Sequence, residues 1–159
     1  MRKIDMIVAH CTASRENQEL KPLDLVKMHR QRGFYTCGYH YYITRDGEIH
    51  TMRPVRDVGA HARGHNGQSI GVAYEGGLDQ EGKPADTRTD RQKRSLRILL
   101  RVLMTDYPIT QVVGHRDLSE DLNGDGIVTP DEWSKMCPCF DAKAEYADLL
   151  QMMMERRGL

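Results

Sequence analysis

The sequence lacks an excess of charge of either sign and lacks any long apolar run. It holds 23 Lys and Arg and 23 Asp and Glu among 159 residues, so its formal net charge at pH 7 is zero. Binding to a phosphate backbone relies on surplus positive charge, so we do not expect nucleic acid as a partner. No segment approaches the ~20 consecutive apolar residues that span a bilayer, so we expect no membrane-spanning segment.

We also expect neither a secretion signal nor a disulfide framework. The apolar run near the start is short, and Asp5 interrupts it before any small-residue cleavage site. We therefore expect synthesis in the cytoplasm without a signal peptide. The four cysteines are Cys11, Cys37, Cys137 and Cys139. A reducing compartment, and a chain long enough to bury its own core, favour free thiols over disulfides.

The chain has no repeats and no low-complexity linker, and its apolar pattern predicts several strands. We expect strands over 4–9, 69–74 and 110–113, and a β-hairpin over 38–52. The Asp46-Gly47 pair is typical of the turn in such a hairpin. A glycine inside the 69–74 strand indicates a close approach of another group to the backbone.

Three helices are expected between and after these strands. The first begins at Pro22 and stops at Gly33, the second follows a Thr89–Gln92 capping box, and the third begins near Asp141. The second helix has apolar residues at helical spacing, which are Leu96, Leu99, Leu100, Leu103 and Met104. Together these elements predict one α/β domain over residues 1–159, with a central mixed β-sheet flanked by helices.

Two histidines and a cysteine are candidate metal ligands. His10 closes the first apolar run, His115 follows the 110–113 strand, and Cys137 lies in a downstream Cys-Pro-Cys motif. Sites are often built at strand ends, and catalytic zinc is held by three protein ligands of these types plus water. We predict that His10, His115 and Cys137 bind one zinc ion. Two alternatives stay open: His10 as a buried core histidine, and Cys139 as the ligand thiolate.

A second candidate metal site is the 12-residue segment 121–132. It matches the EF-hand pattern, which has oxygen ligands at positions 1, 3, 5, 7 and 12 and glycine at position 6. The corresponding ligand residues are Asp121, Asn123, Asp125, Ile127 and Glu132. We expect calcium to brace an insertion over 118–134 and to take no part in catalysis, because oxygen ligands suit a hard cation. The alternative is an acidic turn without an ion, since no strong helix pattern precedes it.

Six motifs along the chain match one known family in order. They cover residues 8–13, 38–47, 59–66, 69–72, 114–117 and 135–141. Together they resemble the zinc-dependent N-acetylmuramoyl-L-alanine amidases, the family of T7 lysozyme and the peptidoglycan recognition proteins. The resemblance runs from about residue 4 to 150 and implies the T7 lysozyme-like fold. It also implies hydrolysis of the amide between N-acetylmuramic acid and the L-alanine of the stem peptide.

The resemblance also assigns roles to single residues. It places the zinc ligands at the two histidines and the cysteine already named. The family's ligand cysteine aligns with Cys137 and not with Cys139. The family's catalytic tyrosine and lysine correspond to Tyr39 and Lys135, which suit a negatively charged oxygen in the transition state. His61 and Asn66 match positions that line the substrate groove.

Three functions are compatible with these residues. Because Tyr39, Lys135 and Cys137 are all present, we expect a hydrolase. A non-catalytic peptidoglycan-binding module is the alternative, since some members of the family recognise the polymer without cutting it. A purely structural zinc protein would need a fourth ligand, for which Cys11 or Cys139 is the local candidate. We expect a monomer that acts on peptidoglycan or on a soluble muropeptide, either in cytoplasmic recycling or after release to the wall by a phage holin.

Overall fold

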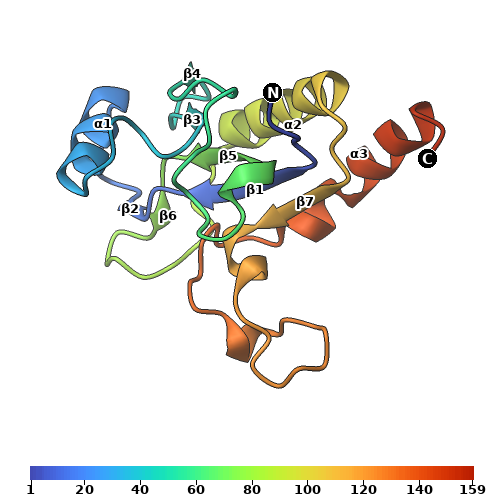
Figure 1. Cartoon of the computed structure of the whole chain (residues 1–159). Coiled ribbons are helices and arrows are strands. Elements are labelled where there is room, and N and C mark those ends of the chain that lie inside the picture. The colour runs from blue at the N-terminus through green and yellow to red at the C-terminus, as the bar shows by residue number, and fades with distance from the viewer.

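A five-stranded sheet forms the centre of the protein (Figure 1). In the computed structural model, which describes residues 1–159, the strands lie in the order β4-β3-β5-β1-β7. Their bounds are Met6–Cys11 for β1, Tyr41–Ile43 for β3, Ile49–Thr51 for β4, Ser69–Tyr74 for β5 and Gln111–Gly114 for β7. Neighbouring strands are parallel except in the antiparallel β3–β4 hairpin. The predicted mixed sheet and the hairpin are therefore confirmed.

Side-chain alternation along β1 divides the interior into two faces. All of β1 is buried, because the strand lies between β5 and β7 with both faces covered. Ile7 and Ala9 belong to the main core cluster, whereas Met6 and Val8 belong to a separate cluster. Successive residues of a strand point to opposite faces, so His10 shares the face of Met6 and Val8.

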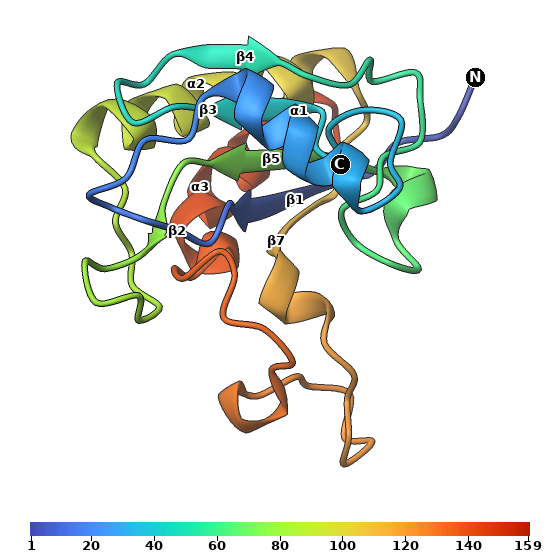
Figure 2. The same ribbon diagram turned by 90° about the vertical axis from the view of Figure 1, so that its left-hand side faces the viewer.

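The three helices are divided between these faces (Figure 2). Their bounds are Pro22–Gln31 for α1, Asp90–Asp106 for α2 and Ala142–Arg156 for α3. Leu100 of α2 and Tyr146 of α3 are buried in the main cluster, so both helices cover the face of Ile7. Leu25 of α1 packs with Tyr42 on the other side of the sheet. The His10 face is therefore the one covered by α1 and the loops.

The helix boundaries follow the predicted caps. Thr89 accepts a hydrogen bond from the Gln92 N–H at 3.1 Å, and the Gln92 side chain accepts one from the Thr89 N–H at 3.0 Å. This capping box satisfies two donors that a helix start would otherwise leave unpaired. After α1, Gly33 takes a φ of +96°, which glycine adopts without strain.

The remaining elements are short. They are β2 (Ser14–Arg15), β6 (Gly77–Leu78) and 3-10 turns at Asn66–Gln68, His115–Leu118 and Pro130–Glu132. The 118–134 segment projects from the body of the protein in both views (Figures 1 and 2). None of the helices combines the length and the apolarity needed to cross a bilayer.

Several strand boundaries differ from the sequence-based expectation, and β7 is shifted by one residue, from the expected 110–113 to Gln111–Gly114. The first strand was expected over 4–9 but runs from Met6 to Cys11, because β5 supplies pairing partners from Ser69 to Tyr74. His10 therefore lies inside the strand and not beyond it. The hairpin was expected from residue 38, but β3 begins only at Tyr41. Gly38 lies very close to the backbone of Ala60: an added Cβ on Gly38 would be 2.2 Å from the Ala60 carbonyl oxygen. The residues before β3 therefore form a tightly packed loop.

Candidate metal centre and substrate cleft

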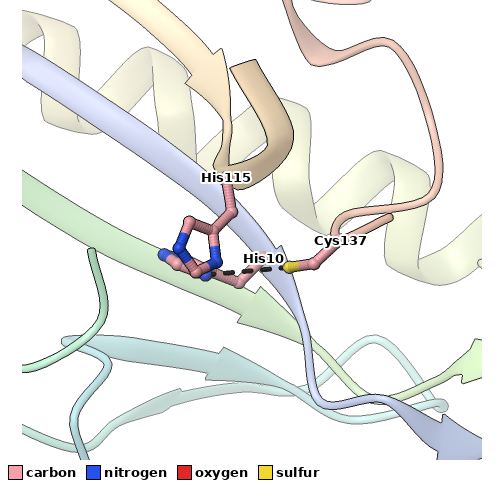
Figure 3. Close-up of side chains that lie close together, drawn as sticks. All are labelled: His10, His115 and Cys137. Carbon is pink, nitrogen blue, oxygen red and sulfur yellow. Dashed lines mark hydrogen bonds between the residues drawn. The ribbon is translucent and has the colours of Figure 1, made fainter. Parts of the chain in front are cut away.

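The two histidines and the cysteine predicted as ligands lie together (Figure 3). His10 comes from β1, His115 follows β7, and Cys137 comes from the loop before α3. Their ligand atoms all lie within 4.8 Å of one another. His10 Nδ1 is 3.8 Å from Cys137 Sγ, and the two imidazole centroids are 4.6 Å apart.

Local packing explains this convergence. Ala9 pairs with Gly114 across the parallel β1–β7 ladder, so the next residues, His10 and His115, lie side by side. An added Cβ on Gly114 would be 2.7 Å from Pro138 Cδ, so the glycine leaves room for the Cys-Pro segment. The Arg116 N–H donates to the Cys137 carbonyl at 2.8 Å, which ties the two ligand segments together.

The donor atoms fit a zinc ion. In a tetrahedral site with ordinary Zn–N and Zn–S bonds, nitrogen and sulfur are roughly 3.5 Å apart, close to the observed separation. Burial lowers the pKa of His10 well below its ordinary value, and burial together with the nearby Lys135 charge lowers that of His115 to about 4. Both rings are therefore neutral near pH 7 and can donate a lone pair. The Cys11 N–H donates to Cys137 Sγ at 3.2 Å, which holds the sulfur atom beside the two rings.

The other nearby thiols point elsewhere. Cys139 Sγ donates to the Gly77 carbonyl at 3.4 Å, and a hydrogen bond with Cys11 together with burial raises the pKa of Cys139. The hydrogen bond of Cys11 with Cys137 raises the pKa of Cys11 to about 12. Neither thiol belongs to the convergent group of ligand atoms, so the geometry favours Cys137 over Cys139 as the ligand.

A cleft of about 930 Å³ opens over this centre. Tyr39 and Lys135 both line it. The Tyr39 ring centroid is 5.0 Å from that of His10, and its hydroxyl donates to the Cys11 carbonyl at 3.5 Å. Burial raises the pKa of Tyr39 well above its ordinary value, so the phenol stays protonated. Lys135 is exposed, and its charge can reach a ligand in the cleft.

His61 and Asn66 also border the cleft, but their polar atoms are occupied within the protein. His61 Nδ1 is 2.8 Å from His10 Nε2, and Asn66 Oδ1 accepts the N–H groups of His61 and Ala62, each at 2.9 Å. Burial lowers the pKa of His61 to about 3, so its ring is neutral. Sequence reasoning missed this contact between His61 and a candidate ligand. The only sign of this contact in the sequence was the glycine in the 69–74 strand, which predicted a close approach of another group. That group is the His61 ring, because an added Cβ on Gly71 would be 2.6 Å from it.

The acidic 121–132 loop lies in the projecting segment between His115 and Cys137. Carboxylate oxygens of Asp121, Asp125 and Glu132 come within 4.8 Å of one another. Asp121 accepts the Gly126 N–H at 2.7 Å, and Gly126 takes a φ of +85°. The loop thus has the turn at position 6 that the calcium pattern requires.

An α/β domain that gathers two histidines and a cysteine beside a cleft defines a candidate metal centre. The family model described as N-acetylmuramoyl-L-alanine amidase matches residues 1–138. The chain therefore belongs to the N-acetylmuramoyl-L-alanine amidase family, as the six motifs predicted.

Similar proteins include a phage endolysin and a solved amidase structure. The endolysin of Escherichia phage T7 is 34% identical over 139 residues, which cover 87% of this chain and 83% of the phage protein. An uncharacterized protein of Haemophilus influenzae is 49% identical over 96 residues, 60% of this chain and 83% of that protein. Among solved structures, the N-acetylmuramoyl-L-alanine amidase LysC from Clostridium intestinale matches with a TM-score of 0.71 and 33% identity, covering 93% of this chain and 86% of that chain.

Proposed function

We propose that the protein is a zinc-dependent hydrolase that cleaves the amide between N-acetylmuramic acid and L-alanine in peptidoglycan. The observation that carries this proposal is the convergence of His10, His115 and Cys137 beside a cleft that also holds Tyr39 and Lys135. Membership in the amidase family supports the choice of bond.

The side chains of the cleft would share the chemistry as follows. When bound by the three ligands, zinc supplies a Lewis acid that polarises a carbonyl and lowers the pKa of water. Lys135 and the protonated Tyr39 donate to the oxygen of the scissile carbonyl as negative charge develops on it. The leaving amine needs a proton, for which Tyr39, Lys135 or a relayed water are the candidates.

A non-catalytic peptidoglycan-binding module is the second candidate, because the same cleft would hold the polymer without cutting it. The test is to incubate the purified protein with peptidoglycan and with a muropeptide, with and without a chelator, and to identify products by mass. We expect free stem peptide with an L-alanine amino terminus, lost on chelation and in Cys137→Ser. Binding without any product would favour the non-catalytic binding module. Cleavage of the glycan chain would contradict the proposed amidase activity.

We further propose an endolysin role, with release to the wall through a holin. The likeness to the phage T7 endolysin supports it. A cytoplasmic recycling role predicts a preference for soluble muropeptide instead. Comparing lysis of permeabilised bacteria with turnover of a purified muropeptide, at equal enzyme concentration, separates the two roles.

We also propose that the 121–132 loop binds calcium as a structural brace, supported by the converging carboxylates of Asp121, Asp125 and Glu132. Adding calcium to the zinc-loaded protein should raise its melting temperature, because a ligand that binds only the folded state stabilises it by about 2.7 kcal/mol at 100 times Kd. Asp121→Asn should abolish the rise, whereas Asp131→Asn, an exposed acid outside the convergent group, should keep it. Equal melting temperatures with and without calcium would leave the loop as an acidic turn.

A further inference from the structure

A series of buried hydrogen bonds leads from a backbone carbonyl to the candidate ligand His10. It begins at Ser69, which is fully buried and whose Oγ lies 2.7 Å from the His65 carbonyl oxygen. A carbonyl only accepts, and a serine hydroxyl has a single hydrogen, so Ser69 donates that hydrogen to His65. Toward any other neighbour, Ser69 Oγ can act only as an acceptor.

The next member of the series is His61. Its Nε2 lies 3.2 Å from Ser69 Oγ, so Nε2 must carry the hydrogen and donate it to the serine. The ring is buried and forms no hydrogen bond or ion pair with a carboxylate, so it is neutral and has one N–H only. His61 Nδ1 is therefore left as an acceptor.

The protonation of His61 sets the direction of the hydrogen bond between His61 and His10. His10 Nε2 lies 2.8 Å from His61 Nδ1, and since Nδ1 accepts, His10 Nε2 must be the protonated nitrogen. His10 Nδ1 then bears the lone pair, and it is this nitrogen that lies 3.8 Å from Cys137 Sγ. The hydrogen-bond series thus leaves unprotonated the one nitrogen of His10 that faces the other candidate ligands.

The His61 ring is held in place from several sides. Added Cβ atoms on Gly71 and Gly59 would lie 2.6 Å and 2.7 Å from ring atoms of His61, so both glycines make room for the ring. Asn66 holds the backbone of the same loop through the N–H groups of His61 and Ala62. The ring therefore has little freedom to turn away from His10.

We propose that His61 is a positioning residue which, together with Ser69, fixes the tautomer of His10 so that Nδ1 binds the metal. This inference rests on the proposed zinc site. A histidine ligand normally donates its second N–H to a carboxylate, a carbonyl or water. Here the acceptor is the imidazole of His61. Its Nδ1 can accept because the hydrogen bond to Ser69 keeps the single ring hydrogen of His61 on Nε2.

The tautomers can be observed directly in the unmodified protein. We would label the histidines with ¹⁵N and record two-bond ¹H–¹⁵N correlations before and after adding zinc. In the metal-free protein both His61 and His10 should show the Nε2–H form, and zinc should shift Nδ1 of His10. An Nδ1–H or doubly protonated His61 would overturn the proposal.

Matched variants test the effect on metal binding. In His61→Asn the amide lies near the position of Nδ1 and can still accept from His10, whereas in His61→Gln it lies near Nε2 and can reach only Ser69. By competition with a chromophoric chelator, we expect zinc affinity near the parent value for His61→Asn and about 10–100-fold weaker binding for His61→Gln. Ser69→Ala, which removes one buried oxygen, should also weaken binding.

The controls separate this proposal from the proposed function. Melting temperatures of the metal-free variants report folding, and the tautomer measurement on the parent decides the matter if a variant unfolds. If the parent binds zinc no better than His10→Ala, the zinc site itself fails and the role of His61 fails with it. If the parent binds zinc through His10 and both His61 variants bind equally well, only the positioning role is wrong.

Discussion

At the scale of single residues, replacing Lys135 should lower the catalytic rate without removing the metal. Lys135 is exposed beside the cleft and is not among the convergent metal ligands. Lys135→Ala should lower kcat on a muropeptide by about 10²–10³-fold, because losing one oxyanion donor costs about 2.7–4 kcal/mol of barrier. Zinc content, measured by metal analysis, should stay at the parent level.

A matched control is Lys143→Ala, which removes another exposed cation from α3, outside the cleft. Its kcat should equal that of the parent. If Lys135→Ala lost its zinc along with its activity, the residue would be a structural part of the metal centre and not an oxyanion donor.

Tyr39 offers a second test at this scale, because its phenol is a candidate proton donor. Burial keeps its pKa well above 10, so the phenol remains a donor across the neutral range. Tyr39→Phe should lower kcat and alter the alkaline side of the pH–rate profile, since the protonated group is absent. A profile of unchanged shape would remove Tyr39 from the protonation of the leaving amine.

The residue scale is also where sequence reasoning was least complete. It brought His10, His115 and Cys137 to one place, because each lies in or directly after a segment with a clear pattern. It could not reveal that His61 contacts His10, because that contact depends on how a loop without periodicity folds over β5. A hydrogen-bond partner 51 positions away leaves no local pattern in the sequence.

At the scale of elements, β5 links sheet packing to the metal centre through Gly71. Gly71→Ala should lower the free energy of unfolding by about 1–3 kcal/mol, the usual cost of overpacking, because its Cβ would be 2.6 Å from the His61 ring. Urea unfolding of the metal-free protein measures this. Gly67→Ala is the control, because an added Cβ there meets nothing within 4 Å. Equal losses in both variants would show that backbone flexibility, and not the His61 contact, explains the effect.

Elements with strong local signals were predicted best. The second helix, with its Thr89–Gln92 cap, and the hairpin turn at Asp46-Gly47 both occur where the pattern placed them. The ends of β1 and β3 were wrong, because strand ends depend on which partner strand supplies hydrogen bonds. That information is tertiary and does not appear in a local window.

At the scale of the whole molecule, buried and half-buried histidines make stability depend on pH. Burial lowers the pKa of His40 and of His115 to about 4 and that of His61 to about 3, whereas unfolded histidine titrates near 6.5. Between these values the unfolded chain binds more protons than the folded one. The free energy of unfolding should therefore fall as pH drops from about 6.5 to about 4, by up to about 1.4 kcal/mol per pH unit for each such histidine.

This prediction is checked by urea unfolding of the metal-free protein at a series of pH values. With the proposed zinc site, added zinc should counteract the loss, since protons and metal would compete for nitrogens of His10 and His115. A free energy of unfolding that stays constant from pH 7 to pH 4.5 would show that these rings are not neutral in the folded protein.

The placement of the projecting segment has a consequence for how such chains diversify. Residues 118–134 lie between His115 and Cys137, whose side chains the folded core holds close together (Figure 3), so both ends of the segment are anchored whatever lies between them. The entropy of closing a loop grows only with the logarithm of its length, and each doubling costs about 0.6 kcal/mol. Segments of other lengths and compositions could therefore be exchanged at this point with little cost to the rest of the fold.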